Sequence, residues 1–452
     1  MAGAIVRRTV DEAAEGLVEA LTAYGVEHIF LNPGTDTFPI QEALAKLAAA
    51  GRTVPRTVLC IFETVALAAA HGYYAATGRA QAVLVHVDVG TQNLGGMLHN
   101  AQRGRAAVLV MAGRAPYTTD PARRGARDSY IHWLQEQMDQ HGIVRNYVKW
   151  DYELRRSDQV GEALARGLQI ARSDPPGPVY LTLPRELLMD PVGEVALHRP
   201  DRFPPVALGA GDPAALAEAA RALLAAERPL VIAGNTGRTA AGYHALIELA
   251  QLLGLPVVEW RERASFPLDH PLHQGADAAP LIEDADVVLA LDVDVPYIPT
   301  RTGPPADAIV VQIDRDPVKE RVPLWTFPLS QAIRADTAAA LPLIVAEARR
   351  RLAATDHERI EARRHRLADR HRAMRARWDA EAEADATATP ITPVWLSACL
   401  GSLLREAPDC LVVDETVTNS QTLWRYAAPN GPESWYVSGG SGLGWALGAA
   451  LG

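Results

Sequence analysis

A glutamate occupies a position from which a carboxyl group could act in proton transfer. Glu63 follows the apolar run at residues 58–62, which predicts a buried strand, and precedes a predicted helix at residues 64–77. Ligands bind at the ends of strands in open α/β sheets. The residues on both sides of Glu63 are apolar, and apolar surroundings raise the pKa of a carboxyl group. On these residues alone, a helix-start glutamate favoured by the helix dipole remains an alternative.

A histidine follows a second apolar run. His86 lies near the end of the predicted strand at residues 82–87, just before Asp88 and a turn at Gly90. Histidine is the side chain whose charge changes near neutral pH, so it is suited to carry a proton in catalysis. A core histidine with satisfied hydrogen bonds is the alternative interpretation.

A third feature is the glycine-rich turn at residues 439–444, which precedes a predicted helix. Closely spaced glycines allow a backbone to approach a flat ring or a phosphate. The turn does not follow the dinucleotide-binding pattern, because Trp445 or Leu447 stands where its last glycine would be. The first part of the chain also lacks that pattern, which disfavours a nicotinamide-dependent oxidoreductase.

The elements that must position these residues alternate between strand and helix. The 452 residues are enough for about three domains. Alternating patterns at residues 1–190 and 205–350 predict parallel sheets with helices on both faces. Residues 350–390 are polar and rich in Arg and Ala, which predicts a helical linker. Residues 391–452 begin a third α/β block that is too short to be complete. We therefore predict an α/β protein of three serial domains, the third incomplete.

Composition excludes several classes of function. The net charge of −10 argues against nucleic acid or an anionic membrane as partner, because both require clustered basic charge. The three cysteines, Cys60, Cys399 and Cys410, have no metal-site or disulfide spacing, which suggests a reducing cytoplasm. We expect neither a signal peptide nor a membrane span, since no apolar run is long enough for either.

Five short segments are together far more specific than any one of them. They are FLNPGTD at 30–36, Glu63 with HGY at 71–73, VHVDVGTQN at 85–93, LHNA at 98–101 and GLGWALGAALG at 442–452. The series resembles the thiamine-diphosphate-dependent decarboxylase and acetolactate synthase superfamily, and its motifs are nearest to benzoylformate decarboxylase. HPLHQG at 270–275 and IDRDP at 313–317 extend the resemblance to the middle of the chain.

The resemblance implies roles for three side chains. Glu63 matches the family's glutamate that hydrogen-bonds the cofactor's aminopyrimidine ring and promotes the tautomer that activates the cofactor, which then acts as an electron sink. His86 matches a histidine used for proton transfer near the substrate, and Thr35 matches a serine that faces the substrate. A second active-site histidine would fall near Tyr297 and Ile298. None is there, which argues against benzoylformate itself as substrate.

The resemblance also implies where the cofactor would be held. In the first block, Pro33, Gly34 and Asn93 match cofactor-binding positions of the family. In the third block, a diphosphate site corresponds to Thr416, Thr418 and Asn419. The backbone at Ser441 and Gly442 would meet the aminopyrimidine, and Leu443 would be the apolar wedge that bends the cofactor. The family's magnesium motif would follow the last residue, so we expect Mg²⁺ ligands beyond Gly452 and assign none within the chain.

These features predict a thiamine-diphosphate-dependent lyase or carboligase that acts on a 2-keto acid or a 2-hydroxyacyl substrate. The alternative is a non-catalytic homologue that serves as a binding or regulatory subunit. The missing magnesium motif favours that alternative only if the protein really ends at Gly452, and Glu63 disfavours it. The family's active site lies between two subunits, which implies a homodimer or homotetramer. Whether the enzyme decarboxylates or ligates, and whether the central block binds FAD, CoA or a nucleotide, stays open.

Overall fold

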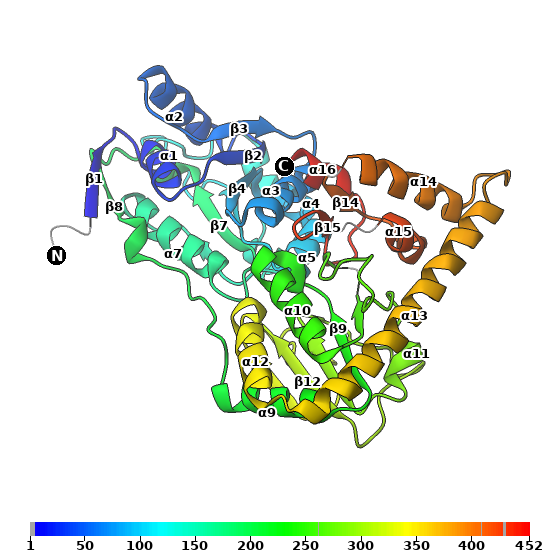
Figure 1. Ribbon diagram of the computed structural model, residues 1–452. Coiled ribbons are helices and arrows are strands. Elements are labelled where there is room, and N and C mark those ends of the chain that lie inside the picture. Colours follow the sequence, from blue (N-terminus) through cyan, green and yellow to red (C-terminus); the bar gives the residue numbers. More distant parts are fainter. Residues whose placement is uncertain (1–4, 261, 408, 428–430) are drawn as a thin grey trace. The chain divides into compact units, whose positions relative to one another are not determined.

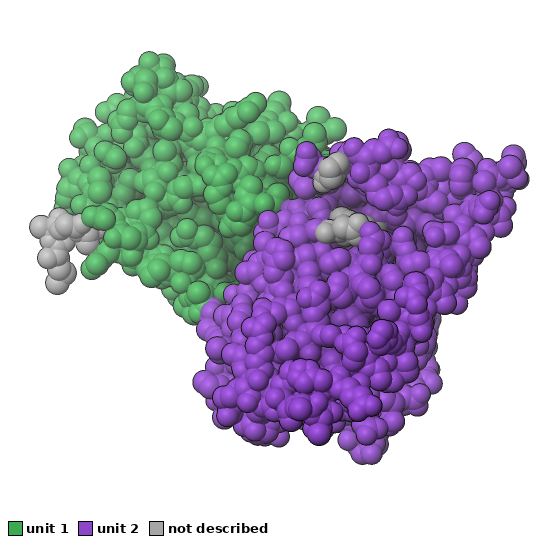
Figure 2. Space-filling model, viewed as in Figure 1, with its two compact units in different colours: residues 1–207, 438–452 green, residues 208–437 purple. Residues whose placement is uncertain are grey.

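The computed structural model describes residues 5–260, 262–407, 409–427 and 431–452 (Figure 1). The chain forms two compact units, which are coloured separately in Figure 2. Unit 1 comprises residues 1–207 and 438–452, and unit 2 comprises residues 208–437. In the described ranges, no helix is long and apolar enough to cross a membrane.

Unit 1 is built on a six-stranded parallel sheet with the order β3-β2-β4-β5-β7-β6. Its strands are β2 (His28–Asn32), β3 (Arg56–Leu59), β4 (Gln81–Val85), β5 (Val108–Arg114), β6 (Asp151–Glu153) and β7 (Val179–Pro184). The chain runs from β2 to β3 on one side and returns to β4 on the other side. The direction of the topology therefore switches between β2 and β4, and ligands in open α/β sheets bind beside such a switch.

The central strands of this sheet have helices on both faces, and every residue of β4 and β7 is accordingly buried. The helices of unit 1 are α1 (Ala13–Ala23), α2 (Phe38–Ala49), α3 (Glu63–Thr77), α4 (Val87–Asn93), α5 (Gly95–Arg103), α6 (Ile131–Leu134), α7 (Val160–Arg172), α8 (Arg185–Leu188) and α16 (Trp445–Leu451). An antiparallel ribbon of β1 (Ile5–Thr9) and β8 (Glu194–His198) completes the unit.

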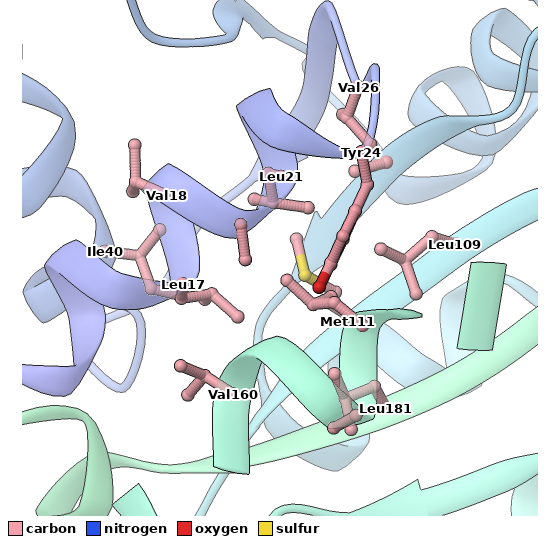
Figure 3. Packing of buried hydrophobic residues seen from close by; sticks show 14 of the residues in the cluster. Leu17, Val18, Leu21, Tyr24, Val26, Ile40, Leu109, Met111, Val160 and Leu181 are labelled. Carbon is pink, nitrogen blue, oxygen red and sulfur yellow. The ribbon is translucent and has the colours of Figure 1, made fainter. Parts of the chain in front are cut away.

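The core of unit 1 lies between α1, α7 and one face of the sheet (Figure 3). Leu109 and Met111, two residues apart on β5, point to the same face and pack against the helices. Tyr24 directs its hydroxyl into this cluster and donates a hydrogen bond to the carbonyl oxygen of Gly161 at 3.1 Å. Burial raises the pKa of Tyr24 to about 12, so the phenol stays neutral at physiological pH.

The last segment of the chain packs on α3. Gly72 allows α16 to approach closely, because a Cβ there would lie 2.1 Å from the carbonyl oxygen of Ala449. The indole of Trp445, which is fully buried, donates a hydrogen bond to His71 Nδ1 at 3.0 Å. The helix that follows the glycine-rich turn is therefore part of unit 1.

Unit 2 contains a five-stranded parallel sheet with the order β10-β9-β11-β12-β13 and a two-stranded parallel sheet of β14 and β15. Its strands are β9 (Pro229–Ala233), β10 (Val257–Glu259), β11 (Val287–Leu291), β12 (Ile309–Asp314), β13 (Gln331–Arg334), β14 (Val412–Asp414) and β15 (Trp435–Val437). Its helices are α9 (Pro213–Ala225), α10 (Ala240–Leu253), α11 (Ala279–Ile282), α12 (Thr337–Arg351), α13 (Ala354–Ala384), α14 (Pro393–Glu406) and α15 (Ser420–Ala427). The larger sheet switches direction between β9 and β11.

The predicted α/β class, with parallel sheets flanked by helices, is confirmed. Three boundaries differ from the sequence prediction. The strand predicted to reach residue 62 ends at Leu59, because β3 lies at the sheet edge and has only one neighbour. The strand predicted to reach residue 87 ends at Val85, and His86 caps α4 instead. The sequence at residues 90–100 predicts a single helix, whereas the structure has two helices that meet at Leu94, just before the poor helix formers Gly95 and Gly96.

Candidate active site

Glu63 is the first residue of α3 and is only 6% exposed. Its Oε2 accepts a hydrogen bond from the Asn93 side chain at 3.0 Å. Its Oε1 lies against α4, where a Cβ at Gly90 would be 3.2 Å away. The structure therefore brings two of the predicted site residues, Glu63 and Asn93, into contact.

The apolar side chains beside Glu63 point outward in unit 1. The residues that precede it are exposed, Ile61 by 92% and Phe62 by 46%. The sequence predicted that these residues would surround the carboxyl group. They do not, because the chain leaves the edge strand at Leu59 and reaches α3 through an extended turn. With Leu59 and Val89, they form what we term the apolar rim of the site.

His86 lies at the carboxyl end of β4 and is the N-cap residue of α4. Its Nδ1 is hydrogen-bonded to Oδ1 of Asp36, which follows β2. The Asp36 carboxylate raises the pKa of His86 against the opposing effect of burial. The imidazole keeps 24% of its side-chain surface exposed. This partial exposure distinguishes it from a fully enclosed core histidine.

The loop after β2 carries Pro33, Gly34 and Thr35 at the same end of the sheet. Two hydrogen bonds fix the loop: the Asn32 side chain donates to the Cys60 carbonyl at 2.8 Å, and the Thr37 hydroxyl donates to the Gly34 carbonyl at 2.9 Å. Thr35 itself is exposed. Because β2 and β4 are neighbours, Thr35 and His86 lie on the two sides of the switch in the sheet.

The glycine-rich turn is held by Asn100, a residue to which the sequence reasoning gave no role. The buried Asn100 side chain donates to the Gly442 carbonyl and accepts from the Gly442 N–H, both at 2.8 Å. Ser441 Oγ lies 3.3 Å from His99 Nε2, and Leu443 is 73% exposed. The motif at residues 98–101 was the available signal, because its Asn100 is the sixth residue of α5 and its amide can face another backbone.

The predicted diphosphate residues lie in unit 2. The backbone N–H and the hydroxyl of Thr416 both donate to Asp414 Oδ1 at 2.7 Å, which forms a tight turn after β14. Thr418 and Asn419 are exposed and immediately precede α15, which begins at Ser420. Exposed hydroxyl and amide groups before a helix N-terminus can bind phosphate oxygens. The other predicted site residues belong to unit 1.

A cavity of about 750 Å³ is lined by residues of α13, α14 and α15, among them Arg375, Asp379 and Trp395. It contains none of the predicted site residues. Across the described parts of the chain, no group of three or more His, Cys, Asp or Glu residues could hold a metal ion.

Comparison with known protein families identifies the class of this protein. Residues 11–143 match the N-terminal TPP-binding domain of thiamine pyrophosphate enzymes, and residues 216–341 match the central domain of the same enzymes. The two matches together cover more than half of the chain. The chain belongs to the thiamine pyrophosphate enzyme family.

Its curated relatives include decarboxylases and acetolactate synthases. A probable 2-ketoarginine decarboxylase of Pseudomonas aeruginosa is 27% identical over 97% of this chain and 74% of the relative. Benzoylformate decarboxylase of the same organism is 25% identical over 96% of this chain and 76% of the relative. A probable acetolactate synthase large subunit of Methanocaldococcus jannaschii is 24% identical over 68% of this chain. The match spans about half the length of that synthase, 52%.

Solved structures share the fold. A thiamin diphosphate-dependent enzyme of Mycobacterium smegmatis superposes with a TM-score of 0.73 at 23% identity, over 97% of this chain and 79% of that structure. Benzoylformate decarboxylase of Polynucleobacter necessarius also superposes with a TM-score of 0.73, at 22% identity, over 98% of this chain and 77% of that structure.

Proposed function

We propose that this chain is a thiamine-diphosphate-dependent lyase or carboligase that acts on a 2-keto acid or a 2-hydroxyacyl substrate. The observation that carries the proposal is the buried Glu63 carboxyl at the start of α3, held by Asn93 and facing Gly90 of α4. A buried carboxyl can hydrogen-bond a ring nitrogen, and the absence of a side chain at residue 90 leaves space beside it. These residues fit the aminopyrimidine of thiamine diphosphate.

Glu63 has a defined task in this proposal. Thiamine diphosphate, when bound, supplies an electron sink for carbon–carbon bond cleavage or formation. The Glu63 carboxyl would hold a proton at the aminopyrimidine, and Asn93 would fix the orientation of that carboxyl through the hydrogen bond to Oε2. A group that moves a proton must lie within hydrogen-bond reach of the atom it serves, so this fixed orientation matters.

His86 and Thr35 would serve the substrate. The protonated imidazole is a cation at the sheet edge and would attract the carboxylate of a 2-keto acid through a charge-assisted hydrogen bond. The same ring can give or take a proton near neutral pH. The exposed Thr35 hydroxyl would add a neutral hydrogen bond to the same carboxylate. Pro33 and Gly34 would shape the loop that carries it.

The remaining cofactor contacts follow from the same proposal. Thr416, Thr418 and Asn419 would bind the diphosphate, with Mg²⁺ as the bridging cation. The turn at Ser441 and Gly442 would face the aminopyrimidine, and the exposed Leu443 would offer the cofactor an apolar contact. In domain terms, residues 1–190 would bind the pyrimidine, 205–350 would form the central domain, 350–390 the linker and 391–452 the start of the diphosphate domain.

We further propose that the chain assembles as a homodimer or homotetramer. The apolar rim supports this, because it places exposed side chains such as Ile61 directly beside a functional carboxyl group. A second subunit that covered the rim would remove this surface from water and enclose Glu63. Sedimentation velocity would test the assembly, and a stable monomer at micromolar concentration would contradict it. A cytoplasmic location is proposed because the three cysteines are free.

A panel assay tests the catalytic proposal. The protein would be incubated with thiamine diphosphate, Mg²⁺ and each of a series of 2-keto acids with apolar, acidic and guanidinium-bearing tails. Release of carbon dioxide and formation of acyloins would be measured separately, with omission of thiamine diphosphate as the control. Cofactor-dependent turnover of at least one substrate is expected. The proposal fails if a protein that binds thiamine diphosphate turns over none of them.

A further inference from the structure

A carboxylate and an imidazole meet at the switch point of the unit 1 sheet. Asp36 follows β2 and His86 follows β4, and these strands are neighbours although β3 lies between them in the sequence. Asp36 is only 2% exposed. Its Oδ1 is bonded to His86 Nδ1, and its Oδ2 accepts a hydrogen bond from the backbone N–H of Val87 at 3.2 Å. The carboxylate thus contacts both the ring and the start of α4.

The space around this pair is made by a glycine on a third strand. A Cβ at Gly113 of β5 would lie 1.5 Å from Asp36 Oδ2. The backbone of Gly113 does not have a positive φ, so its conformation does not require glycine. What requires glycine there is the buried carboxyl group of Asp36. Gly34 is similarly close to the ring, since a Cβ there would lie 1.9 Å from His86 Nδ1.

Other polar groups face the pair from neighbouring elements. The Gln135 side chain, after α6, and Asp88 of α4 each raise the pKa of His86 further, but less than Asp36 does. Gln135 is 5% exposed, and its Nε2 has no hydrogen-bond partner among the described residues. Burial lowers the pKa of His132, and Arg185 lowers it further. Asp36 has the opposite effect and raises the pKa of His132. The Asp36 contact dominates the electrostatics of His86.

We propose that Asp36 is a positioning residue that holds the imidazole of His86 in one tautomer and one orientation for proton transfer. An ionised carboxylate can only accept a hydrogen bond, so Nδ1 must carry a proton in this pair. Nε2 is then the nitrogen that exchanges a proton with the substrate. When Nε2 gives its proton to a substrate atom, the ring becomes neutral and keeps Nδ1–H on Asp36. The catalytic meaning of this pair depends on the proposed function, whereas the pairing itself does not.

The same geometry predicts that His86 is protonated more readily than an isolated histidine. A buried carboxylate within hydrogen-bond distance favours the protonated imidazole, and the pKa of His86 is raised accordingly. A purely structural ion pair would also raise the pKa. It would not make turnover depend on the carboxylate. The two roles are therefore separated by measuring the titration of His86 and the kinetics in the same variants.

The first measurement is an NMR titration of the full chain labelled with ¹⁵N-histidine, with His86 assigned by comparison with His86→Gln. Asp36→Asn keeps the size of the side chain and removes its charge, so the pKa of His86 should fall. Asp88→Asn is the matched control, because it removes a buried carboxylate that attracts His86 without contacting it. Its effect should be clearly smaller. Equal shifts in the two variants would overturn the pairing.

The second measurement is kinetic. Asp36→Asn should lower kcat about 10- to 100-fold, with KM changed far less, as expected when a carboxylate that orients a histidine is removed. The pH profile should lose its dependence on the raised pKa of His86. Gly113→Ala should have the same effect with both charges retained, because its methyl group displaces the Asp36 carboxyl. Circular dichroism and thermal unfolding would verify that each variant is folded.

Each outcome decides a different point. A lowered His86 pKa with unchanged kcat in Asp36→Asn would overturn the positioning role and leave a structural pair. If Gly113→Ala is unfolded, Asp36→Asn alone still decides. If the wild-type protein turns over no 2-keto acid while the NMR titration behaves as expected, the proposed function fails and the pairing stands.

Discussion

The two larger sheets of this protein share a switch in strand order next to their first strand but use their carboxyl ends differently. Each is parallel, and each switches direction next to its first strand, between β2 and β4 in unit 1 and between β9 and β11 in unit 2. At the unit 1 switch stand Asp36 and the partly exposed His86. At the unit 2 switch, the fully buried Asp292 is paired with Arg238 and with the Thr337 hydroxyl.

A second buried pair strengthens the contrast in unit 2. Lys319 is 3% exposed and lies 2.6 Å from Asp314 and 2.9 Å from Asp294. Charges in the central sheet therefore neutralise one another within the unit. In unit 1, the Glu63 carboxyl is held by a neutral amide from Asn93 and by no cation within the described residues. We infer that the unit 2 edge serves stability, and the unit 1 edge is the one that the proposed function assigns to chemistry.

The largest expected effect tests the unit 1 edge. Glu63→Gln keeps the shape of the side chain and the contact with Asn93 but removes the ability to carry a proton. We expect turnover to fall by about 10²- to 10⁴-fold, the usual contribution of a positioned acid or base. The free energy of unfolding should change by less than about 1 kcal/mol. Steady-state kinetics and urea unfolding would be measured on the same preparation. A large loss of stability would instead assign Glu63 a structural role.

The next effect tests the unit 2 edge. Asp314→Asn removes the fully buried partner of Lys319 and leaves that ammonium with Asp294 alone. Breaking a buried ion pair costs about 3–5 kcal/mol, so we expect a loss of about 3 kcal/mol in urea unfolding. Asp294→Asn is the control, because Asp294 is 36% exposed, and it should cost about 1 kcal/mol or less. Turnover of the folded Asp314→Asn protein should be nearly unchanged. A reversed order of the two stability losses would contradict the comparison.

A smaller effect concerns pH, and His86 and His371 should respond with opposite signs. The pKa of His86 is raised by Asp36, so its contribution to stability is full below about pH 6.5 and is lost as the pH rises through the folded-state value. The pKa of His371 in unit 2 is lowered by burial, so His371 binds a proton more readily in the unfolded chain than in the folded protein. The contribution of His371 to the free energy of unfolding should therefore fall as the pH drops below about 6.5.

Two variants separate these contributions. The difference in unfolding free energy between wild type and His86→Gln should shrink as the pH rises above about 6.5. The difference between wild type and His371→Gln should shrink as the pH falls below about 6.5. Thermal unfolding between pH 5 and pH 8 would measure both differences, and equal slopes for the two variants would contradict the prediction. The His371 ring also donates to the His273 carbonyl at 2.7 Å, a bond that the glutamine can partly replace.

The smallest effect concerns helix caps. The helices that begin at the unit 1 site, α3 and α4, have Phe62 and His86 at their N-cap positions, and neither side chain makes a capping hydrogen bond. In unit 2, the Thr239 side chain accepts from the Gly242 N–H at the start of α10. Thr239→Ala should cost about 1 kcal/mol in urea unfolding, whereas Phe62→Ser should add about 0.5–1 kcal/mol. A loss of stability in Phe62→Ser would show that the rim residue already contributes packing.

Much of the fold could be predicted from local patterns. The sequence predicts strands at 229–233 and 287–291 and a helix at 240–253, and β9, β11 and α10 have these bounds. Apolar runs and helical periodicity mark such buried elements directly. The position of Glu63 between a strand and a helix was also predictable. The end of β3 was not, because Cys60 to Phe62 continue the apolar run while the edge of the sheet ends the pairing at Leu59.

The residues of the candidate site also fall into a group that could be predicted from the sequence and a group that could not. Glu63, His86, Thr35 and the glycine-rich turn were predicted from residue types and their resemblance to a family. Three partners were not: Asp36 for His86, Asn100 for Gly442, and Gln135. The Asn100 contact joins residues 342 positions apart. No local sequence pattern predicts such contacts, because they depend on which segments the fold brings together.

The amino-acid sequence by itself determined the alternating strands and helices, the residue types able to carry protons, and membership of the thiamine pyrophosphate enzymes. The tertiary structure decided which of those residues meet. Strand order places β4 beside β2, so a carboxylate and an imidazole 50 positions apart form a pair in unit 1. The corresponding switch in unit 2, where β11 lies beside β9, brings Asp292 to Arg238. Charge and burial act over a few ångströms, and only the folded chain sets those distances.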